Sequence, residues 1–390
     1  MNTRPITVLL ESRFQRDDAD TWYTASSLEA GSGWAELVSV GPARLAARVS
    51  PGVAAGTRAV HGPTIALPNY TGVIGALRSL PALVRAIDRS VRGSSAVVVK
   101  LPGIIGLVAV GAARRARVPV IAQVVGDIED VLHSGVAGRS GRLLAPVARA
   151  IVAAAVRRSR LVRYVTEHTL QQKYPPASDA TAIAFSDVEL LGAPAWQPSA
   201  RDAAVRRVVA VGSQEQSYKG HDLLVHATAQ LNARDLPYQV ELILIGSGRT
   251  QSQLRELARA LGQEGAVRFA GHISDPVKLR SLLLEADLFA LPSRTEGMPR
   301  ALIEAMGLGL PCIASRVGGV PELLPDEAIV AVGDVDGLRE AIERVLSDEG
   351  LARRLSEAGA LHAQRFAPEV REVRRARWLV EVARVARSGA

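Results

Sequence analysis

The stretch between residues 286 and 315 constrains the fold more than any other, because it predicts a strand, a tight loop, a helix and a second strand in succession. The first strand is expected at 286–291, the helix at 301–308 and the second strand at 310–315. Such a βαβ unit joins two parallel strands, and its loop lies at the carboxyl end of the first strand, where doubly wound sheets bind ligands. We therefore expect a parallel α/β sheet with a ligand site in this loop.

The loop itself suits a phosphorylated ligand. Gly297 lets the backbone come close to a ligand, and Pro299 suits the first helical position, where its missing N–H would have no partner. The free N–H groups at the start of the helix attract a phosphate. Glu296 in the loop and Glu304 in the helix place carboxylates on either side of that position. A nucleotide sugar has hydroxyls on both sides of its phosphates and fits such an arrangement.

This stretch resembles the donor-site signature of family 4 of the retaining glycosyltransferases, which have the two-domain GT-B fold. The signature is a pair of glutamates separated by seven residues, within an E-G-x-P…E-A-M frame, and a continuation that residues 318–322 also match. The resemblance implies that Glu296 faces the donor sugar, that Glu304 binds the ribose hydroxyls, and that the loop backbone holds the sugar and the diphosphate. The donor-binding residues that it implies here are Glu296, Gly297, Met298, Pro299, Arg300 and Glu304.

A second part of the donor site is expected after a predicted strand at 207–211. The loop that follows, from Gly212 to Gly220, resembles the family's Lys-Gly motif, in which the lysine binds the donor diphosphate. Lysine suits this role as a mobile point charge with three donors. A purely structural role for Lys219 is less favourable, because a cation at a helix start opposes the helix dipole.

One departure from the family pattern lies in this loop. Most members have an arginine directly after the first glycine, where this chain has Ser213, so half of the usual cationic clamp is missing. Arg249, Arg294 or Arg300 would replace it; the alternatives are weak activity or a changed donor preference. Two later turns are expected to face the same site. Gly246 and Arg249 follow an apolar strand, and Ile273 follows a strand that resembles the family's base-contacting segment.

Length and pattern predict two domains. A chain of 390 residues is long for one domain, and apolar runs alternate with segments of helical spacing, as in a doubly wound parallel sheet. Together with the resemblance, this predicts an α/β protein of the GT-B fold, with two Rossmann-like doubly wound domains that face a cleft. The expected parts are an acceptor domain at 1–188, a linker at 189–204, a donor domain at 205–368, and a helix at 369–390 that crosses back to the first domain.

The acceptor-side residue is harder to place. A predicted strand at 118–125 is followed by Gly126 and Asp127, and a carboxylate at that end of a strand is well placed to act on an acceptor hydroxyl. Many family members have a histidine near this position, so we name Asp127 in its place, with His133 as the runner-up. A capping or surface role is an equal alternative for both.

The net charge of +8 suits nucleic acid, an anionic membrane or a phosphorylated substrate. Nucleic acid is disfavoured, because aromatic residues make up only 4% and no nucleic-acid-binding motif occurs. Arg157, Arg158 and Arg160 follow a predicted helix, where they either complement its carboxyl end or contact anionic lipid. With neither a signal peptide nor a membrane span predicted, we expect a cytoplasmic protein, with the inner membrane face as an optional peripheral contact.

We expect neither a cofactor nor a bound metal. The full dinucleotide fingerprint is absent, which argues against NAD. Asp334 and Asp336 form an Asp-x-Asp motif, but a predicted helix follows directly, so helix capping explains them. Cys312 is the single cysteine, which excludes a disulfide within the chain, and its apolar strand predicts a buried thiol.

These expectations combine into a retaining hexosyltransferase that moves sugar from a UDP- or GDP-sugar to an acceptor hydroxyl of a glycan, glycolipid or metabolite. The catalytic residues implied are Asp127, Glu296 and Lys219. In the family, retention is thought to be front-face, so no protein nucleophile and no metal would be required. Two alternatives stay open: a nucleotide-sugar epimerase of the same fold, and a non-catalytic nucleotide-sugar binding protein.

Overall fold

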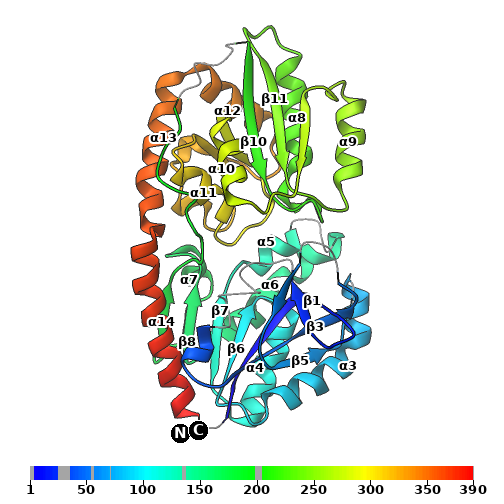
Figure 1. Ribbon diagram of the computed structural model, residues 1–390, viewed down its shortest axis with the longest axis vertical. Coiled ribbons are helices and arrows are strands. Elements are labelled where there is room, and N and C mark those ends of the chain that lie inside the picture. The colour runs from blue at the N-terminus through cyan, green and yellow to red at the C-terminus, as the bar shows by residue number, and fades with distance from the viewer. Residues whose placement is uncertain are drawn as a thin grey trace. The chain divides into compact units, whose positions relative to one another are not determined.

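The computed structural model describes residues 4–24, 36–53, 57–70, 72–133, 138–197 and 204–389, and the statements below concern these. The chain forms two compact units. The first comprises Met1–Ile128, Leu144–Phe185 and Glu372–Ala390, and the second comprises Glu129–Leu143 and Ser186–Arg371 (Figure 1). Part of the linker expected at 189–204 lies outside the described residues, namely 198–203.

The first unit contains a mostly parallel sheet. Its strands run in the order β4-β2-β1-β6-β7-β8-β9, while β3 pairs with β1 and β5; only β2 is antiparallel to its neighbours β1 and β4. The strands are β1 (Ile6–Arg16), β2 (Trp22–Thr24), β3 (Ala43–Pro51), β4 (Arg58–Val60), β5 (Thr64–Leu67), β6 (Ala96–Leu101), β7 (Val120–Val124), β8 (Leu161–Tyr164) and β9 (Thr181–Ala184). The α-helices of this unit are α3 (Gly72–Val91), α4 (Ile104–Ala116), most of α6 (Gly138–Arg157), α7 (Thr169–Lys173) and most of α14 (Pro368–Ser388). Helix α5 (Ile128–His133), apart from its first residue, and the first residues of α6 count with the second unit.

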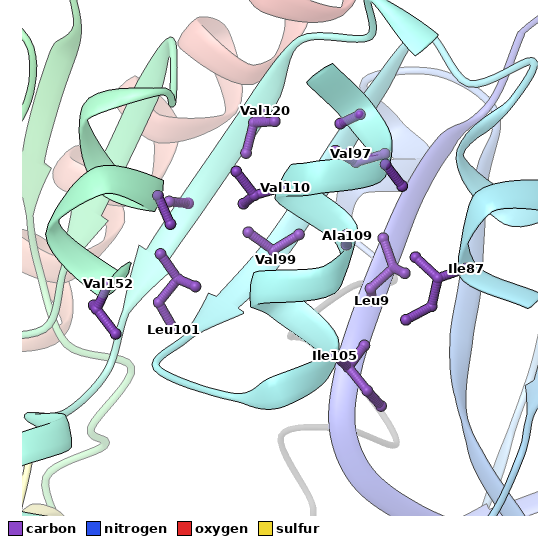
Figure 2. Packing of buried hydrophobic residues seen from close by; sticks show 14 of the residues in the cluster. Leu9, Ile87, Val97, Val99, Leu101, Ile105, Ala109, Val110, Val120 and Val152 are labelled. Atoms are coloured by element: carbon purple, nitrogen blue, oxygen red, sulfur yellow. The ribbon is translucent and has the colours of Figure 1, made fainter. Parts of the chain in front are cut away.

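Both faces of this sheet are buried, which explains why its central strands are mostly apolar. Successive side chains of a strand point to opposite faces. Val97 and Val99 of β6 therefore join Leu9 in a core with α3 and α4, which Figure 2 shows from close by. Val98 joins the second core, on the other face, together with Trp378 of α14.

The second unit contains a six-stranded parallel sheet in the order β12-β11-β10-β13-β14-β15. Its strands are β10 (Val205–Val211), β11 (Gln239–Ile245), β12 (Val267–Gly271), β13 (Leu288–Leu291), β14 (Cys312–Ser315) and β15 (Ile329–Val330). Its α-helices are α8 (His221–Asn232), α9 (Gln251–Ala260), α10 (Pro276–Leu284), α11 (Arg300–Gly307), α12 (Val335–Ser347) and α13 (Glu349–Ala363). The chain builds one side of the sheet from β10 to β12 and then returns to add β13 beside β10, so the topological switch point lies between β10 and β13.

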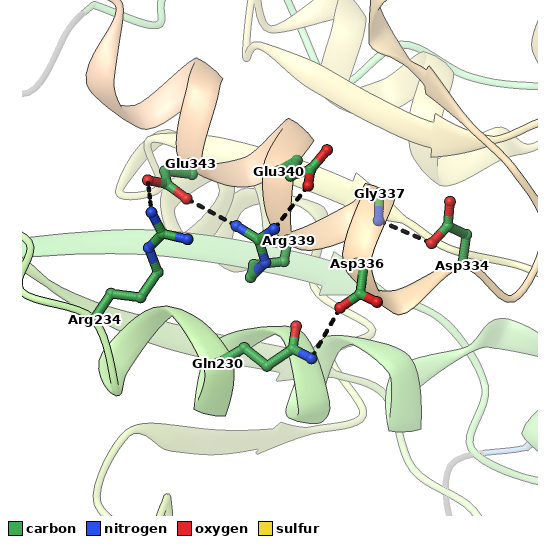
Figure 3. Close-up of polar contacts among 8 residues, drawn as sticks. All are labelled: Gln230, Arg234, Asp334, Asp336, Gly337, Arg339, Glu340 and Glu343. Atoms are coloured by element: carbon green, nitrogen blue, oxygen red, sulfur yellow. Dashed lines mark hydrogen bonds and ion pairs between the residues drawn. The ribbon is translucent and has the colours of Figure 1, made fainter.

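The Asp-x-Asp motif has the capping role that the sequence predicted. Asp334 is the N-cap of α12, where its side chain accepts a hydrogen bond from the N–H of Gly337 at 2.9 Å. Asp336 accepts from Gln230 of α8 at 3.1 Å, as Figure 3 shows. Nearby, Glu343 forms ion pairs with Arg234 and Arg339. In the described part of the chain, no group of three or more His, Cys, Asp or Glu side chains is arranged to hold a metal ion.

Candidate functional site

The candidate site lies at the switch point of the second sheet. Strands β10 and β13 pair in parallel, so the loops that leave their carboxyl ends, residues 212–220 and 292–299, emerge side by side. The backbone N–H of Arg294 donates to the carbonyl of Tyr218 at 2.7 Å, and the Arg294 side chain donates to the carbonyl of Ser217 at 2.6 Å. The sequence indicated the 212–220 loop and the 292–299 loop as separate parts of a site, and these hydrogen bonds join them into one.

Glycines make this close approach feasible. A Cβ at Gly220, whose φ is +70°, would lie 2.1 Å from the carbonyl oxygen of Pro292, so a side chain there would force the two loops apart. Gly318 fits against the same loop from the far side, because a Cβ there would lie 2.3 Å from the carbonyl oxygen of Glu296. Gly319 also donates from its backbone N–H to the carbonyl of Gly297 at 2.6 Å.

Lys219 and Glu296 meet at the centre of the site. The Lys219 Nζ lies 2.6 Å from Glu296 Oε1, and the same oxygen accepts a hydrogen bond from Ser293 Oγ at 2.7 Å. The two charged side chains are only 17% and 9% exposed, respectively. Each side chain supplies the opposite charge that compensates the other one's removal from water. The structure therefore brings together two residues to which the resemblance gave donor-binding roles.

Helix α11 begins at Arg300, one residue before the predicted range of 301–308 and one residue after Pro299. Pro299 is the N-cap, with extended backbone angles, and Arg300 is the first helical residue. The expectation that Pro299 occupies the first helical position is therefore wrong, although Pro299 still lies at the boundary. The backbone N–H groups of the first turn, from Arg300 onward, are left without an intrahelical acceptor. They remain suited to an anion, as expected.

Glu304 lies in the second turn of α11 and is half-buried. Burial raises the pKa of its carboxyl; nearby Glu189 raises it further, and Arg300 opposes both effects. Arg300 itself is exposed at the helix start, and no described hydrogen bond or ion pair engages its side chain. Met298 is 9% exposed and packs against the backbone of Gly319, so it fixes the shape of the loop.

Two of the three arginines considered as replacements at the Ser213 position are engaged elsewhere. Arg294 forms a two-pronged ion pair with Asp222, with contacts of 2.9 and 2.7 Å. Arg249 pairs with Glu215 at 2.9 Å, and both side chains are more than half exposed. Ser213 is itself exposed and accepts a hydrogen bond from the N–H of Glu215 at 3.3 Å. Arg300 thus stays the one candidate of the three without a described partner.

The loop after β11 contacts the start of the β10 loop. A Cβ at Gly246, whose φ is +141°, would lie 1.9 Å from the carbonyl oxygen of Gly212, and Gly246 N–H donates to the carbonyl of Gly271 at the end of β12. Ile273 follows that strand and is partly exposed. The carboxyl ends of β10, β11, β12 and β13 therefore converge, as expected for one ligand site.

Sequence reasoning missed three side chains at this site. Ser293 orients Glu296, as described above. His221 begins α8 and is 5% exposed; burial, with the nearby charge of Lys219, lowers its pKa to about 4. Gln214 is fully buried, and neither polar atom of its amide has a hydrogen-bond partner among the described residues. No periodicity or motif marks any of them, because each role depends on contacts between segments.

A pocket of about 220 Å³ opens between the β10 loop and α9. Its lining includes His221, Asp222 and Ser217 on one side and Thr250 and Leu254 on the other. Lys219 and Glu296 are not part of that lining, so the pocket lies beside the ion pair rather than over it.

Asp127 is in the first unit, and its surroundings weigh against the acceptor role. Its side chain is 1% exposed, forms an ion pair with Lys173 and accepts a hydrogen bond from the Tyr174 hydroxyl. These contacts tie the end of β7 to α7, which is a structural task. The runner-up, His133, is exposed at the end of α5. An acceptor role for either residue stays a prediction.

The basic segment after α6 is at the surface. Arg157, Arg158 and Arg160 are exposed; Arg158 donates to the carbonyl of Ala154 at 3.0 Å, and Arg160 pairs with Asp179 at 2.9 Å. Arg158 thus caps the carboxyl end of its helix, which is one of the two roles that the sequence suggested for this segment. Within the described residues, no helix is long and apolar enough to cross a membrane.

Comparison with known proteins finds glycosyltransferases among the similar sequences. Residues 199–362 match the family model described as "Glycosyl transferases group 1". The chain is 27% identical over 261 residues to Protein CapJ of Staphylococcus aureus, an alignment that covers 66% of this chain and 64% of that protein. It is 34% identical over 167 residues to D-inositol 3-phosphate glycosyltransferase of Corynebacterium aurimucosum (41% and 39%). A GDP-mannose-dependent monoacylated alpha-(1-6)-phosphatidylinositol monomannoside mannosyltransferase of Corynebacterium glutamicum is 35% identical over 166 residues (40% and 42%). The chain therefore spans 39% to 64% of the length of these relatives.

Solved structures define the fold. Sucrose-phosphate synthase from Thermosynechococcus elongatus has a TM-score of 0.70 at 20% identity, covering 97% of this chain and 99% of that chain. HepE from Anabaena, in complex with UDP-glucose, has a TM-score of 0.62 at 20% identity, covering 96% and 99%. The fold of this chain is thus the GT-B fold, as the sequence predicted. Its carboxyl-terminal part, which matches the group 1 model, carries the candidate site.

Proposed function

We propose that this protein is a retaining glycosyltransferase of family 4 that moves a hexosyl group from a UDP- or GDP-sugar to an acceptor hydroxyl. The observation that carries the proposal is the partly buried Lys219–Glu296 pair at the switch point, beside the first turn of α11. Two of the relatives named above are glycosyltransferases by name, one of them GDP-mannose-dependent. One structural neighbour was solved with UDP-glucose, and these names support a nucleotide-sugar donor.

The site supplies what a diphosphate leaving group needs. When the donor enters, its diphosphate competes with Glu296 for the Lys219 ammonium, while the first-turn N–H groups of α11 donate to phosphate oxygens. Glu296, held by Ser293, then has a free oxygen for the hydroxyls of the donor sugar. Glu304 accepts hydrogen bonds from the ribose hydroxyls as a carboxylate.

The reaction requires no protein nucleophile. The bond between the sugar's anomeric carbon and the diphosphate oxygen breaks, and the acceptor hydroxyl bonds to that carbon from the same face. The acceptor proton passes to the leaving phosphate oxygen, so the products are a glycoside and a protonated nucleoside diphosphate. Lys219 stabilises the negative charge that develops on the diphosphate. This step uses no metal ion, and we propose that the reaction is independent of metal.

Location and acceptor also belong to the proposal. We place the enzyme in the cytoplasm, with a peripheral contact to the inner membrane face through Arg157, Arg158 and Arg160 when the acceptor is lipid-linked. A basic patch adds on the order of 1 kcal/mol of membrane affinity per arginine. This contact is separable from the donor chemistry, because its arginines lie in the first unit and the donor residues in the second.

A donor panel tests the proposal. The protein is incubated with UDP-, GDP- and ADP-sugars, and release of nucleoside diphosphate is measured with and without candidate acceptors. Lys219→Ala and Glu304→Ala should each reduce release at least about a hundredfold, because each removes a charge-assisted contact to the donor. Lys278→Ala is the matched control, since that lysine is exposed on α10.

Other outcomes have defined meanings. Unchanged release in Lys219→Ala and Glu304→Ala would contradict the site assignment. Conversion of the donor to an epimer without an acceptor would favour an epimerase. Tight UDP binding without hydrolysis or transfer on any donor would favour a non-catalytic binding protein, the reading to which Ser213 lends weight.

A further inference from the structure

The first unit contains a large basic cavity that the proposed donor chemistry does not use. It has a volume of about 850 Å³, within the range of pockets that hold small ligands. Its lining includes the start of β7, the residues directly before β8, and the carboxyl-terminal ends of α4, α6 and α14. It therefore lies at the amino edge of the sheet, opposite to the edge at which doubly wound sheets bind their substrates.

The charge of this cavity is unusually one-sided. Six arginines line it, and Asp179 is the only acidic residue in the lining, so the formal charge is +5 in a chain whose net charge is +8. The six are Arg114, Arg117, Arg157, Arg158, Arg160 and Arg384. We call them the arginine pocket.

Helix ends do not account for this charge. Three helices end here, and each carboxyl end carries a partial charge of roughly −0.5, about −1.5 in all. That leaves an excess of about 3.5 positive charges after the helix ends and Asp179 are counted. Some of the arginines have internal tasks: Arg160 pairs with Asp179 at 2.9 Å, and Arg384 contacts Glu381 and Thr181.

Three arginines have no such task. Among the described residues, no hydrogen bond or ion pair engages the side chains of Arg114, Arg117 or Arg157. They come from the ends of two different helices, and all three are exposed. Like charges gathered around one cavity repel each other, and a bound anion relieves that repulsion. The planar guanidinium fork matches the oxygens of a phosphate in particular.

We propose that the arginine pocket is a second ligand site, which takes a compact phosphate-bearing anion. Its phosphate oxygens contact Arg114, Arg117 and Arg157, above a floor that includes Val118 and Pro119. The ligand is either a soluble phosphorylated compound or the phosphate of a lipid headgroup. Because Arg384 and Ser388 also line the pocket, the bound ligand fastens the end of α14 to the first sheet.

Calorimetric titration with inorganic pyrophosphate tests the site in the full chain. Arg114→Gln combined with Arg157→Gln should weaken binding by at least about tenfold, because two charge-assisted contacts are lost. The control is Arg115→Gln combined with Arg354→Gln, which removes the same net charge from exposed positions outside the pocket. Lys219→Ala, which disables the proposed donor site, should leave this binding in place.

A second arm distinguishes the two sources of the phosphate. The protein is sedimented with vesicles of phosphatidylcholine alone or with phosphatidylglycerol. If the site binds a lipid headgroup, the protein sediments with the anionic vesicles. Pyrophosphate should then release it from them, and the pocket double variant should no longer sediment. Pyrophosphate binding without vesicle binding assigns it to a soluble compound.

Two results would overturn the proposal. One is equal pyrophosphate affinity in the pocket double variant and the control, which would mean that no built site exists there. The other is complete loss of binding in Lys219→Ala, which would mean that pyrophosphate binds only at the donor site. Neither result would change the release of nucleoside diphosphate that the donor panel measures, so failure of the arginine pocket and failure of the proposed function are distinguishable.

Discussion

At the scale of single residues, the site depends on charges held away from water. Burial raises the pKa of the Glu304 carboxyl and lowers the pKa of the His221 imidazole. In both cases the neutral form is favoured, as expected where solvation of a charge is lost. The consequences differ, because Glu304 is proposed to act as a carboxylate, while His221 has only to stay neutral.

Glu304 should make nucleotide binding sensitive to acid. Its pKa is raised above that of an ordinary glutamate, so the carboxylate is lost at a higher pH than usual as the solution is acidified. The affinity for the nucleoside diphosphate should therefore fall as pH falls through that raised pKa. Titrations between pH 4 and 7 should show this fall in the wild-type protein and a shallower fall in Glu304→Gln, where only the ligand's own phosphate still titrates. The same slope in both proteins would contradict the ribose contact.

His221 should make the second unit acid-labile. Its folded pKa of about 4 lies below the unfolded value of roughly 6.5, so the unfolded chain binds the proton more tightly. Stability is lost as pH falls below the unfolded value, and the loss is complete near the folded pKa; it amounts to at most about 3 kcal/mol. Urea unfolding of His221→Gln should lose less stability over this pH window than the wild type. An unchanged pH dependence would show that the imidazole is not the group responsible.

At the scale of elements, the site is a meeting of two loops that leave neighbouring parallel strands. The sequence predicted the βαβ unit at residues 286–315 well, because its apolar runs and its proline and glycine punctuation are local signals. It placed Pro299 one position too far into the helix, since an N-cap and a first helical residue differ only in ψ. The contact between Lys219 and Glu296 joins residues 77 positions apart, and no local pattern carries such a distance.

The candidate acceptor residue Asp127 also shows that contacts between distant segments cannot be predicted from local sequence. Asp127 was chosen because it follows a strand, and that placement is correct. Its partners Lys173 and Tyr174 lie some 46 positions further along the chain. Through these contacts the buried carboxylate holds two segments together. The position of a residue along a strand can be predicted from the sequence. The residue with which its side chain pairs can be identified only once the fold is known.

Gly220 is the tightest point of the loop contact, and a matched pair of variants measures it. Gly220→Ala and Gly262→Ala both force alanine into a left-handed backbone, with φ of +70° and +68°. Only Gly220 has a neighbour in the way, because nothing lies within 4 Å of a Cβ at Gly262. Gly262→Ala should cost about 1 kcal/mol of unfolding free energy, and Gly220→Ala at least about 2 kcal/mol more. Equal costs in urea unfolding would contradict the close approach of the loops.

At the scale of the whole molecule, the carboxyl-terminal helix belongs to the first unit although it follows the second in sequence. Residues from Glu372 onward count with the first unit. Trp378, Val382 and Val385 are buried in its second core, and Arg374 pairs with Glu167 at 2.8 Å. The core of the first unit is therefore complete only when α14 is in place.

Trp378 tests this dependence. Trp378→Ala should destabilise the protein by about 3 to 5 kcal/mol, because the side chain is 3% exposed and packs edge-on against Phe185. Val380→Ala on the same helix is the control, since that side chain is 63% exposed, and it should cost less than about 0.5 kcal/mol. Chemical unfolding, followed by circular dichroism, measures the unfolding free energy of both variants. Equal and small effects would mean that the helix does not complete the first core.

The central claim is that a nucleoside diphosphate is held at the switch point of the second sheet. A crystal structure with the nucleotide that the donor panel selects tests it most directly. We predict the diphosphate within hydrogen-bond distance of Lys219 Nζ and of the first-turn N–H groups of α11, with the ribose hydroxyls on Glu304. A nucleotide bound elsewhere, with Lys219 still paired to Glu296, would contradict the claim.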